Sequence, residues 1–77
     1  LYKNRGNLHL LFGAHFKAIA DYTKAIQLDD QFAEAYFNRG LANFLAYNKI
    51  AGCSDLSQSE ALGFERATEK RRYFCSP

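Results

Sequence analysis

Apolar and small residues recur along this chain at spacings of three and four, the period of an α-helix with one buried face. The clearest stripe consists of Ala18, Ile19, Tyr22, Ala25 and Ile26, and it predicts an amphipathic helix over residues 15–28. The same pattern predicts four more helices, over residues 1–12, 32–46, 50–62 and 65–74. We therefore expect an all-α protein with five helices.

Turn-forming residues separate the predicted helices. Gly13 lies in the turn after the first helix, and Asp30 is placed to cap the start of the third. Gly63 is placed to end the fourth helix in the left-handed conformation. Because no linker or low-complexity segment divides the helices, we expect residues 1–77 to form a single domain.

A 34-residue internal repeat organises these helices. When residues 1–28 are superposed on residues 35–62, seven positions are identical: Tyr2/Tyr36, Asn4/Asn38, Arg5/Arg39, Gly6/Gly40, Leu11/Leu45, Asp21/Asp55 and Leu28/Leu62. A fixed period of this length is typical of arrays of helix–turn–helix repeats. The few residues that remain after the second copy are sufficient for one further helix.

Both copies resemble tetratricopeptide repeats, and residues 64–75 resemble the terminal capping helix of that family. In the family, an aromatic residue near the start of helix A is followed four positions later by a small residue, and helix B carries a small–aromatic–small pattern. The matching residues here are Tyr2 and Gly6, Tyr36 and Gly40, and then Ala18, Tyr22 and Ala25. We expect a glycine at this place in helix A to let helix B approach closely, so that a larger side chain costs about 1–3 kcal/mol.

The resemblance implies an α-solenoid, a right-handed superhelical stack of antiparallel helix pairs. Repeat 1 would span residues 1–32, repeat 2 residues 33–66, and the capping helix residues 65–75 approximately. In the second repeat, Gly52, Leu56 and Ser59 replace the usual alanine, aromatic residue and alanine. We therefore expect the second helix B to be looser than the first, with Gly52 costing about 0.5–1 kcal/mol relative to alanine.

The family resemblance also implies a concave groove formed by the A helices, in which a peptide or a segment of a partner protein binds. The residues expected to line it are Lys3, Asn7, Leu10, Leu11, Glu34, Phe37, Asn38, Leu41, Phe44 and Leu45. An apolar floor with asparagines suits a peptide whose backbone amides need hydrogen-bond partners. The alternative is a structural or self-associating unit, in which the leucines of this set pack on further repeats or on another copy through the open edge of the array.

A sharper hypothesis is a clamp for the C-terminal carboxylate of an acidic peptide. In some members of the family, lysine, asparagine and arginine side chains on successive A helices hold such a carboxylate. Lys3, Asn7, Asn38 and Arg72 stand at matching places, but Thr68 replaces one expected lysine. Charge-assisted donors would favour the ligand. We rank this clamp below general binding of a peptide in the groove.

Two cysteines could meet if the last two helices are antiparallel. Cys53 and Cys75 lie at similar distances on either side of Gly63, so a disulfide requires only that their Cα atoms come within about 4.4–6.8 Å. A helical repeat needs no covalent link, and nothing in the chain marks it for secretion. We therefore favour two reduced thiols. Because no secretion signal is visible, we also favour a cytoplasmic location.

Composition and charge exclude several other classes of function. The net charge of +2 is small, and Glu65 and Glu69 are interleaved with Arg66 and the basic run at residues 70–72, so we expect no nucleic-acid partner. No apolar run is long enough to span a bilayer, and we expect no membrane partner. His9 and His15 lack the spacing of a helical zinc pair, and no phosphate-binding loop is present. We expect no catalysis, cofactor or metal, and because Leu1 rather than Met begins the chain, we expect a piece of a longer protein.

Overall fold

The computed structural model describes residues 1–75, and within that range every regular element is a helix. The helices are α1 (Tyr2–Leu11), α2 (His15–Leu28), α3 (Ala33–Leu45), α4 (Lys49–Ala61) and α5 (Glu65–Phe74). The five predicted helices are confirmed, and the bounds of α2 and α5 agree with the prediction. The largest difference at any helix end is one residue, which is within the usual uncertainty of helix assignment.

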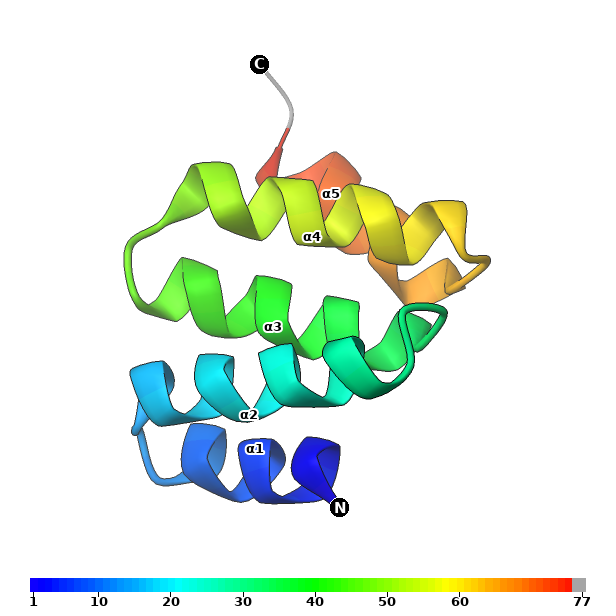
Figure 1. The fold of residues 1–77 in the computed structure, drawn as a ribbon. Coiled ribbons are helices and arrows are strands. Elements are labelled where there is room, and N and C mark those ends of the chain that lie inside the picture. Colours follow the sequence, from blue (N-terminus) through cyan, green and yellow to red (C-terminus); the bar gives the residue numbers. More distant parts are fainter. Residues whose placement is uncertain (76–77) are drawn as a thin grey trace.

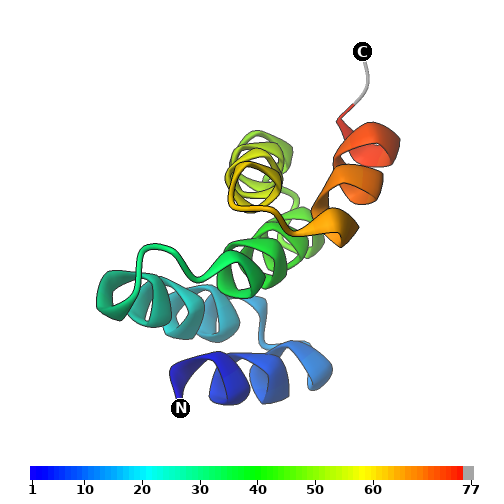
Figure 2. The same cartoon turned by 90° about the vertical axis from the view of Figure 1, so that its right-hand side faces the viewer.

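The helices form a stack of antiparallel pairs (Figure 1). Helix α1 packs on α2, α3 packs on both α2 and α4, and α5 packs on α4. Seen from the side, α1, α3 and α5 lie along one flank of the stack, whereas α2 and α4 lie along the other (Figure 2). This arrangement is the α-solenoid that the 34-residue period predicts. The A helices, α1 and α3, therefore share one flank with the capping helix α5.

Left-handed residues end three of the helices. Gly63 has a φ of 94° and donates its N–H to the Glu60 carbonyl at 2.9 Å, while the Phe64 N–H donates to the Ser59 carbonyl at 3.1 Å. These two bonds form a Schellman motif, which satisfies carbonyl groups at the end of α4. The predicted role of Gly63 is confirmed. Gly13 has the same left-handed conformation in the turn after α1.

The start of α3 differs from the prediction. Its N-cap is Phe32, which makes no side-chain cap, and Asp30 accepts a hydrogen bond from the side-chain amide of Gln31 instead. The prediction that Asp30 caps α3 was wrong because the helix begins too far along the chain for its carboxylate. Asn48 is the one N-cap with a side-chain hydrogen bond in the described residues, accepting from the Ala51 N–H at 3.2 Å.

The core between neighbouring helices consists mainly of small and aromatic residues, together with Ile26 and Leu56. Gly6 illustrates why small residues are needed, since a Cβ atom at this position would lie 2.8 Å from Cε1 of the buried Tyr22 ring. Tyr2 and Tyr36 are partly buried against a second cluster in the same core. The three clusters of buried residues are Ala18, Tyr22 and Ala42; Ala25, Ile26 and Ala35; and Phe37, Leu56 and Ala67.

Helices α3 and α4 pack closely, so the expectation of a loose second repeat was wrong. A Cβ atom at Gly52 would lie 2.9 Å from Cε2 of Phe44 and 3.0 Å from the Gly40 carbonyl oxygen. Leu56 is fully buried, and the Ser59 hydroxyl donates to the Ala33 carbonyl at 2.8 Å. The three residues that depart from the family pattern therefore fill the contact between α3 and α4.

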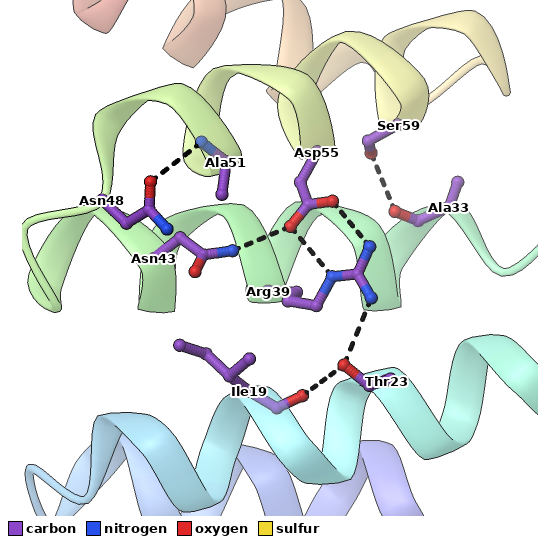
Figure 3. Close-up of polar contacts among 9 residues, drawn as sticks. All are labelled: Ile19, Thr23, Ala33, Arg39, Asn43, Asn48, Ala51, Asp55 and Ser59. Atoms are coloured by element: carbon purple, nitrogen blue, oxygen red, sulfur yellow. Dashed lines mark hydrogen bonds and ion pairs between the residues drawn. The ribbon is translucent and has the colours of Figure 1, made fainter.

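A buried carboxylate in each repeat fixes an arginine from the preceding helix. Arg39 donates two hydrogen bonds to Asp55, at 2.9 and 2.8 Å, and a third to the Thr23 hydroxyl on α2 at 3.2 Å (Figure 3). Asn43 donates to the same carboxylate at 3.0 Å. The network thus joins α2, α3 and α4. The hydrogen bonds that Arg39 donates to Asp55 also raise the pKa of Arg39 above its ordinary value.

The corresponding pair in the first repeat is Arg5 and Asp21. Arg5 donates to the two carboxylate oxygens at 2.9 and 2.8 Å, and this hydrogen bonding holds the pKa of Asp21 below its ordinary value. The arginine side chain is 59% exposed here, against 22% for Arg39. The repeated Arg and Asp identities in the sequence therefore mark an ion pair within each helix pair, with the second pair better shielded from water.

A disulfide joins Cys53 on α4 to Cys75 after α5, with their Cα atoms 5.8 Å apart. The prediction of two reduced thiols was wrong. The antiparallel arrangement of α4 and α5 about Gly63 brings the two cysteines side by side, and the cross-link holds the far end of the capping helix. A closed loop with a sequence separation of 22 corresponds to about 3 kcal/mol of stabilisation in the chain-entropy model.

The capping helix covers the end of the stack with few buried residues. Ala67 is fully buried, and the Phe64 ring lies 5.1 Å from that of Phe37. Arg71 donates to Glu60 on α4 at 2.6 Å. No described helix has the length and apolar character needed to cross a membrane.

Candidate peptide-binding groove

An open hollow lies between the A helices α1 and α3. Five side chains line it: Asn7, Leu10, Leu11, Glu34 and Asn38. All five belong to the set expected for the groove, and they come from the two helices that share one flank of the stack (Figure 2).

Two carboxamides and a buried phenol are linked at the floor of this hollow. The Tyr22 hydroxyl donates to Oδ1 of Asn7 at 2.5 Å, and the Asn38 Nδ2 group donates to the same oxygen at 3.0 Å. Burial, followed by the charges of Glu34 and Asp21, raises the pKa of Tyr22 to about 12, so that the phenol is neutral and can donate. The Asn7 carboxamide is therefore held in one orientation by the core beneath it.

Glu34, the charged residue of the hollow, forms an ion pair with Lys3, which lies outside the five lining side chains. The Lys3 ammonium lies 3.2 Å from a carboxylate oxygen of Glu34, and it also lies over the Phe32 ring at 5.8 Å from the centroid. Lys3 thus has a protein partner for its charge. The opposite charges at the starts of α1 and α3 were visible in the sequence, but their pairing depends on how the helices stack.

The leucines expected in the groove differ in burial. Leu10 is partly buried against the cluster that contains Tyr22, whereas Leu11 is 77% and Leu45 is 50% exposed. The hollow therefore combines one leucine anchored in the core with another that is open to solvent at its edge.

A family model for the TPR repeat matches residues 6–46, which is more than half of the chain. The chain belongs to the tetratricopeptide repeat (TPR) family. TPR domains are non-catalytic modules that generally mediate protein–protein interaction. The resemblance noted in the sequence is therefore confirmed, and it assigns the protein to this class of interaction modules.

Two relatives share the TPR region. The chain is 43% identical over 47 residues to the serine/threonine-protein phosphatase T of Aspergillus oryzae, an alignment that covers 61% of this chain and 10% of that protein. It is 34% identical over 70 residues to the SGT1 homolog of Oryza sativa subsp. japonica, covering 88% of this chain and 19% of the relative. The chain therefore spans only a tenth to a fifth of these proteins. No solved structure matches it.

The TPR stack buries part of the surface that was expected to bind. Phe37 is 1% exposed, and its ring contacts Phe64 and lies 4.9 Å from the Arg66 guanidinium. Leu41 and Phe44 are partly buried in the same cluster. The expectation that Phe37 lines an open groove was wrong, because α5 stands where the A helix of a following repeat would stand and covers this part of α3.

Arg72 lies in the last turn of α5 and is exposed. Its charge acts on Glu60, whose pKa is lowered first by the hydrogen bond from Arg71, then by one from Thr68, and further by the charges of Arg71 and Arg72. The structure thus associates Lys3 with Glu34 and Arg72 with Glu60. In the described residues, no group of three or more histidine, cysteine or acidic side chains could hold a metal ion.

Proposed function

We propose that this TPR domain binds an extended segment of a partner protein in the hollow between α1 and α3. The observation that carries the proposal is the fixed pair of carboxamides, in which Asn38 donates to Oδ1 of Asn7 and the Tyr22 hydroxyl donates to the same oxygen. Both are surface residues of the A helices, and the core phenol of Tyr22 holds the first of them in place.

The chemistry of the two carboxamides suits a peptide backbone. The oxygen of Asn7 accepts two bonds within the protein, which directs its amide N–H groups elsewhere, and the carbonyl of Asn38 is an acceptor on the neighbouring helix. A peptide in extended form offers a carbonyl and an N–H to such a pair. Leu10 and Leu11 supply the apolar contact beside them.

Binding can be tested with a peptide display library offered as internal segments, followed by affinity measurements on the enriched sequences. We expect Asn38→Ala to weaken binding about tenfold, since it removes one or two net hydrogen bonds. Asn38 is preferred over Asn7 because its replacement leaves the Tyr22 hydroxyl paired. Gln58→Ala, at an exposed position of α4, is the control. Enrichment of no segment, or equal affinity of the Asn38 variant, would argue against the groove.

A second proposal is the carboxylate clamp, in which Lys3 and Arg72 would hold a peptide C-terminus with the two asparagines. The ion pair with Glu34 weighs against it, because an incoming carboxylate must compete with a carboxylate already 3.2 Å from Lys3. The test compares one acidic peptide as the free acid and as the amide. A clamp requires tighter binding of the free acid, and a loss of that preference in Lys3→Ala and Arg72→Ala.

The remaining proposal is self-association through the open edge of the array. Its support is the exposure of Leu11 and Leu45, which recur at equivalent positions of the two repeats. The molar mass in solution should then rise with protein concentration and fall again in Leu11→Ser. A mass that stays monomeric over the accessible concentration range would exclude this role.

A further inference from the structure

Large apolar side chains project from both turns that join an A helix to a B helix. Phe12 is 80% exposed and Phe16 is 77% exposed around the turn between α1 and α2; Tyr47 is 98% exposed and Ile50 is 87% exposed around the turn between α3 and α4. The two turns lie at the same edge of the stack, on the left in Figure 1. We refer to these four side chains as the turn edge.

Tyr47 adopts a backbone conformation that its side chain disfavours. Its φ is 62°, and it occupies the left-handed position that Gly13 holds in the first repeat. The N–H of the following Asn48 donates to the Asn43 carbonyl at 2.8 Å, which completes the same helix-ending motif. A glycine would fit this position without strain. Because the ring is almost wholly exposed, the fold gains no packing from it, and a strained exposed residue points to a function outside the fold.

Acidic residues are distributed unevenly between the turn edge and the opposite edge of the stack. Residues 7–20 and 35–54, which contain the two turns, include no aspartate or glutamate, whereas Lys17 and Lys49 are exposed beside the apolar side chains. Acidic residues gather at the turns of the opposite edge, where Asp29 and Asp30 precede α3. The turn edge is therefore apolar and basic.

Stacking of helices along the array leaves this edge uncovered. The capping helix α5 packs on α4 and closes one end of the stack, yet Tyr47 and Ile50 at the nearer turn stay exposed. The occupant of the turn edge must therefore approach from the side. It must accept projecting side chains at two separate tips and must carry negative charge.

We infer that the turn edge docks on the surface of an anionic lipid bilayer. The side chains of the turn edge project outwards and can insert into the surface of a bilayer. A peptide would instead need a groove with hydrogen-bond partners for its backbone. Aromatic side chains such as that of Tyr47 partition into the headgroup region, and Lys17 and Lys49 would contact anionic headgroups. The inference departs from the expectation of no membrane partner, and it is independent of the peptide groove, which lies between the A helices.

Sedimentation with vesicles of phosphatidylcholine alone, and of phosphatidylcholine mixed with phosphatidylserine, tests the inference. We expect binding to the mixed vesicles and its loss at high salt. Lys49→Gln should weaken partitioning about fivefold. Tyr47→Gly should weaken it by a similar factor while raising the thermal midpoint, because the variant removes the ring and relieves the backbone strain together. If the variant binds vesicles more weakly but unfolds at a higher temperature, misfolding cannot explain the loss of binding.

The control variant is Leu28→Ser, which removes an apolar side chain of similar exposure from the acidic edge. It should bind the mixed vesicles like the unmodified protein. Equal sedimentation with both vesicle types, unchanged binding of Tyr47→Gly, or an equal loss in Leu28→Ser would overturn the inference. Binding of an acidic amphipathic peptide at this edge without any binding to vesicles would overturn it too, and would assign the edge to a protein partner.

Discussion

Replacing Gly52 by alanine should destabilise the protein, although alanine is the better helix former. The glycine lies inside α4, where its helix propensity alone predicts a gain of about 1 kcal/mol for the substitution. The contacts across the helix pair predict the reverse. A Cβ atom would lie 2.9 Å from Cε2 of Phe44 and 3.0 Å from the Gly40 carbonyl oxygen.

Neither neighbour can easily withdraw. The Gly40 carbonyl is part of the α3 backbone, and the Phe44 ring packs against that of Phe74, with 5.1 Å between their centroids. The two helices must therefore move apart or the ring must leave its site. Overpacking of this kind costs about 1–3 kcal/mol. Set against the propensity gain, the net loss should be about 1 kcal/mol, or about 4–8 °C in the thermal midpoint of a domain of this size.

Thermal and urea unfolding followed by circular dichroism would measure the effect. Ser57→Ala is the matched control, because this residue is exposed on the same helix and its replacement by alanine changes propensity alone. The double variant Gly52→Ala with Phe44→Leu should recover part of the loss, since the smaller side chain makes room for the new methyl group.

The reasoning would be refuted if Gly52→Ala unfolded at the same temperature as the unmodified protein or above it. An equal gain in Gly52→Ala and Ser57→Ala would mean that the helices adapt without strain. In that case Gly52 would destabilise α4 relative to alanine, as the sequence pattern suggested.

Three further predictions concern the polar and covalent contacts. Asp55→Asn should lower the free energy of unfolding by about 2–3 kcal/mol, and Asp21→Asn should lower it by about 1 kcal/mol. The difference is expected because Arg5, the partner of Asp21, is far more exposed than Arg39, the partner of Asp55. Equal losses of the two variants in urea unfolding would contradict this. The pKa of Tyr22 is raised by burial to about 12, so the stability that depends on the neutral phenol should persist up to about pH 10 and be lost as the pH rises towards 12. Phenolate absorbance read alongside circular dichroism would test it, and full ionisation of all five tyrosines before any unfolding would contradict it. Cys75→Ser should lower the free energy of unfolding by about 3 kcal/mol, and thiol titration of the unfolded, unreduced protein should detect no free thiol, whereas two thiols would exclude the disulfide.

Much of the fold followed from the order of residues along the chain. The stripe of Ala18, Tyr22 and Ala25 predicted α2 because helical period is a property of neighbouring positions, and each predicted helix end lies within one residue of the observed one. The 34-residue period predicted the stack of helix pairs, because equivalent helices in a repeat array make equivalent contacts. Gly63 could be identified as a helix end, since its role depends on the backbone of its own turn.

The candidate site was predicted only in part. Asn7, Leu10 and Asn38 were expected in the groove and line the hollow between α1 and α3. Phe37 was expected there too, but it is buried under α5. The sequence placed Phe37 correctly on an A helix. The sequence pattern did not reveal that α5 covers this face of the helix.

By itself, the sequence determined the helices, the repeat and the membership of the TPR family, all of which depend on spacings along one chain. The tertiary structure alone decided that Gly52 is enclosed, that Lys3 pairs with Glu34, and that Cys53 meets Cys75. Each of these depends on distances of a few ångströms between atoms of different helices. Helix periodicity is unchanged when one helix shifts slightly against another, whereas such a shift creates or abolishes these contacts.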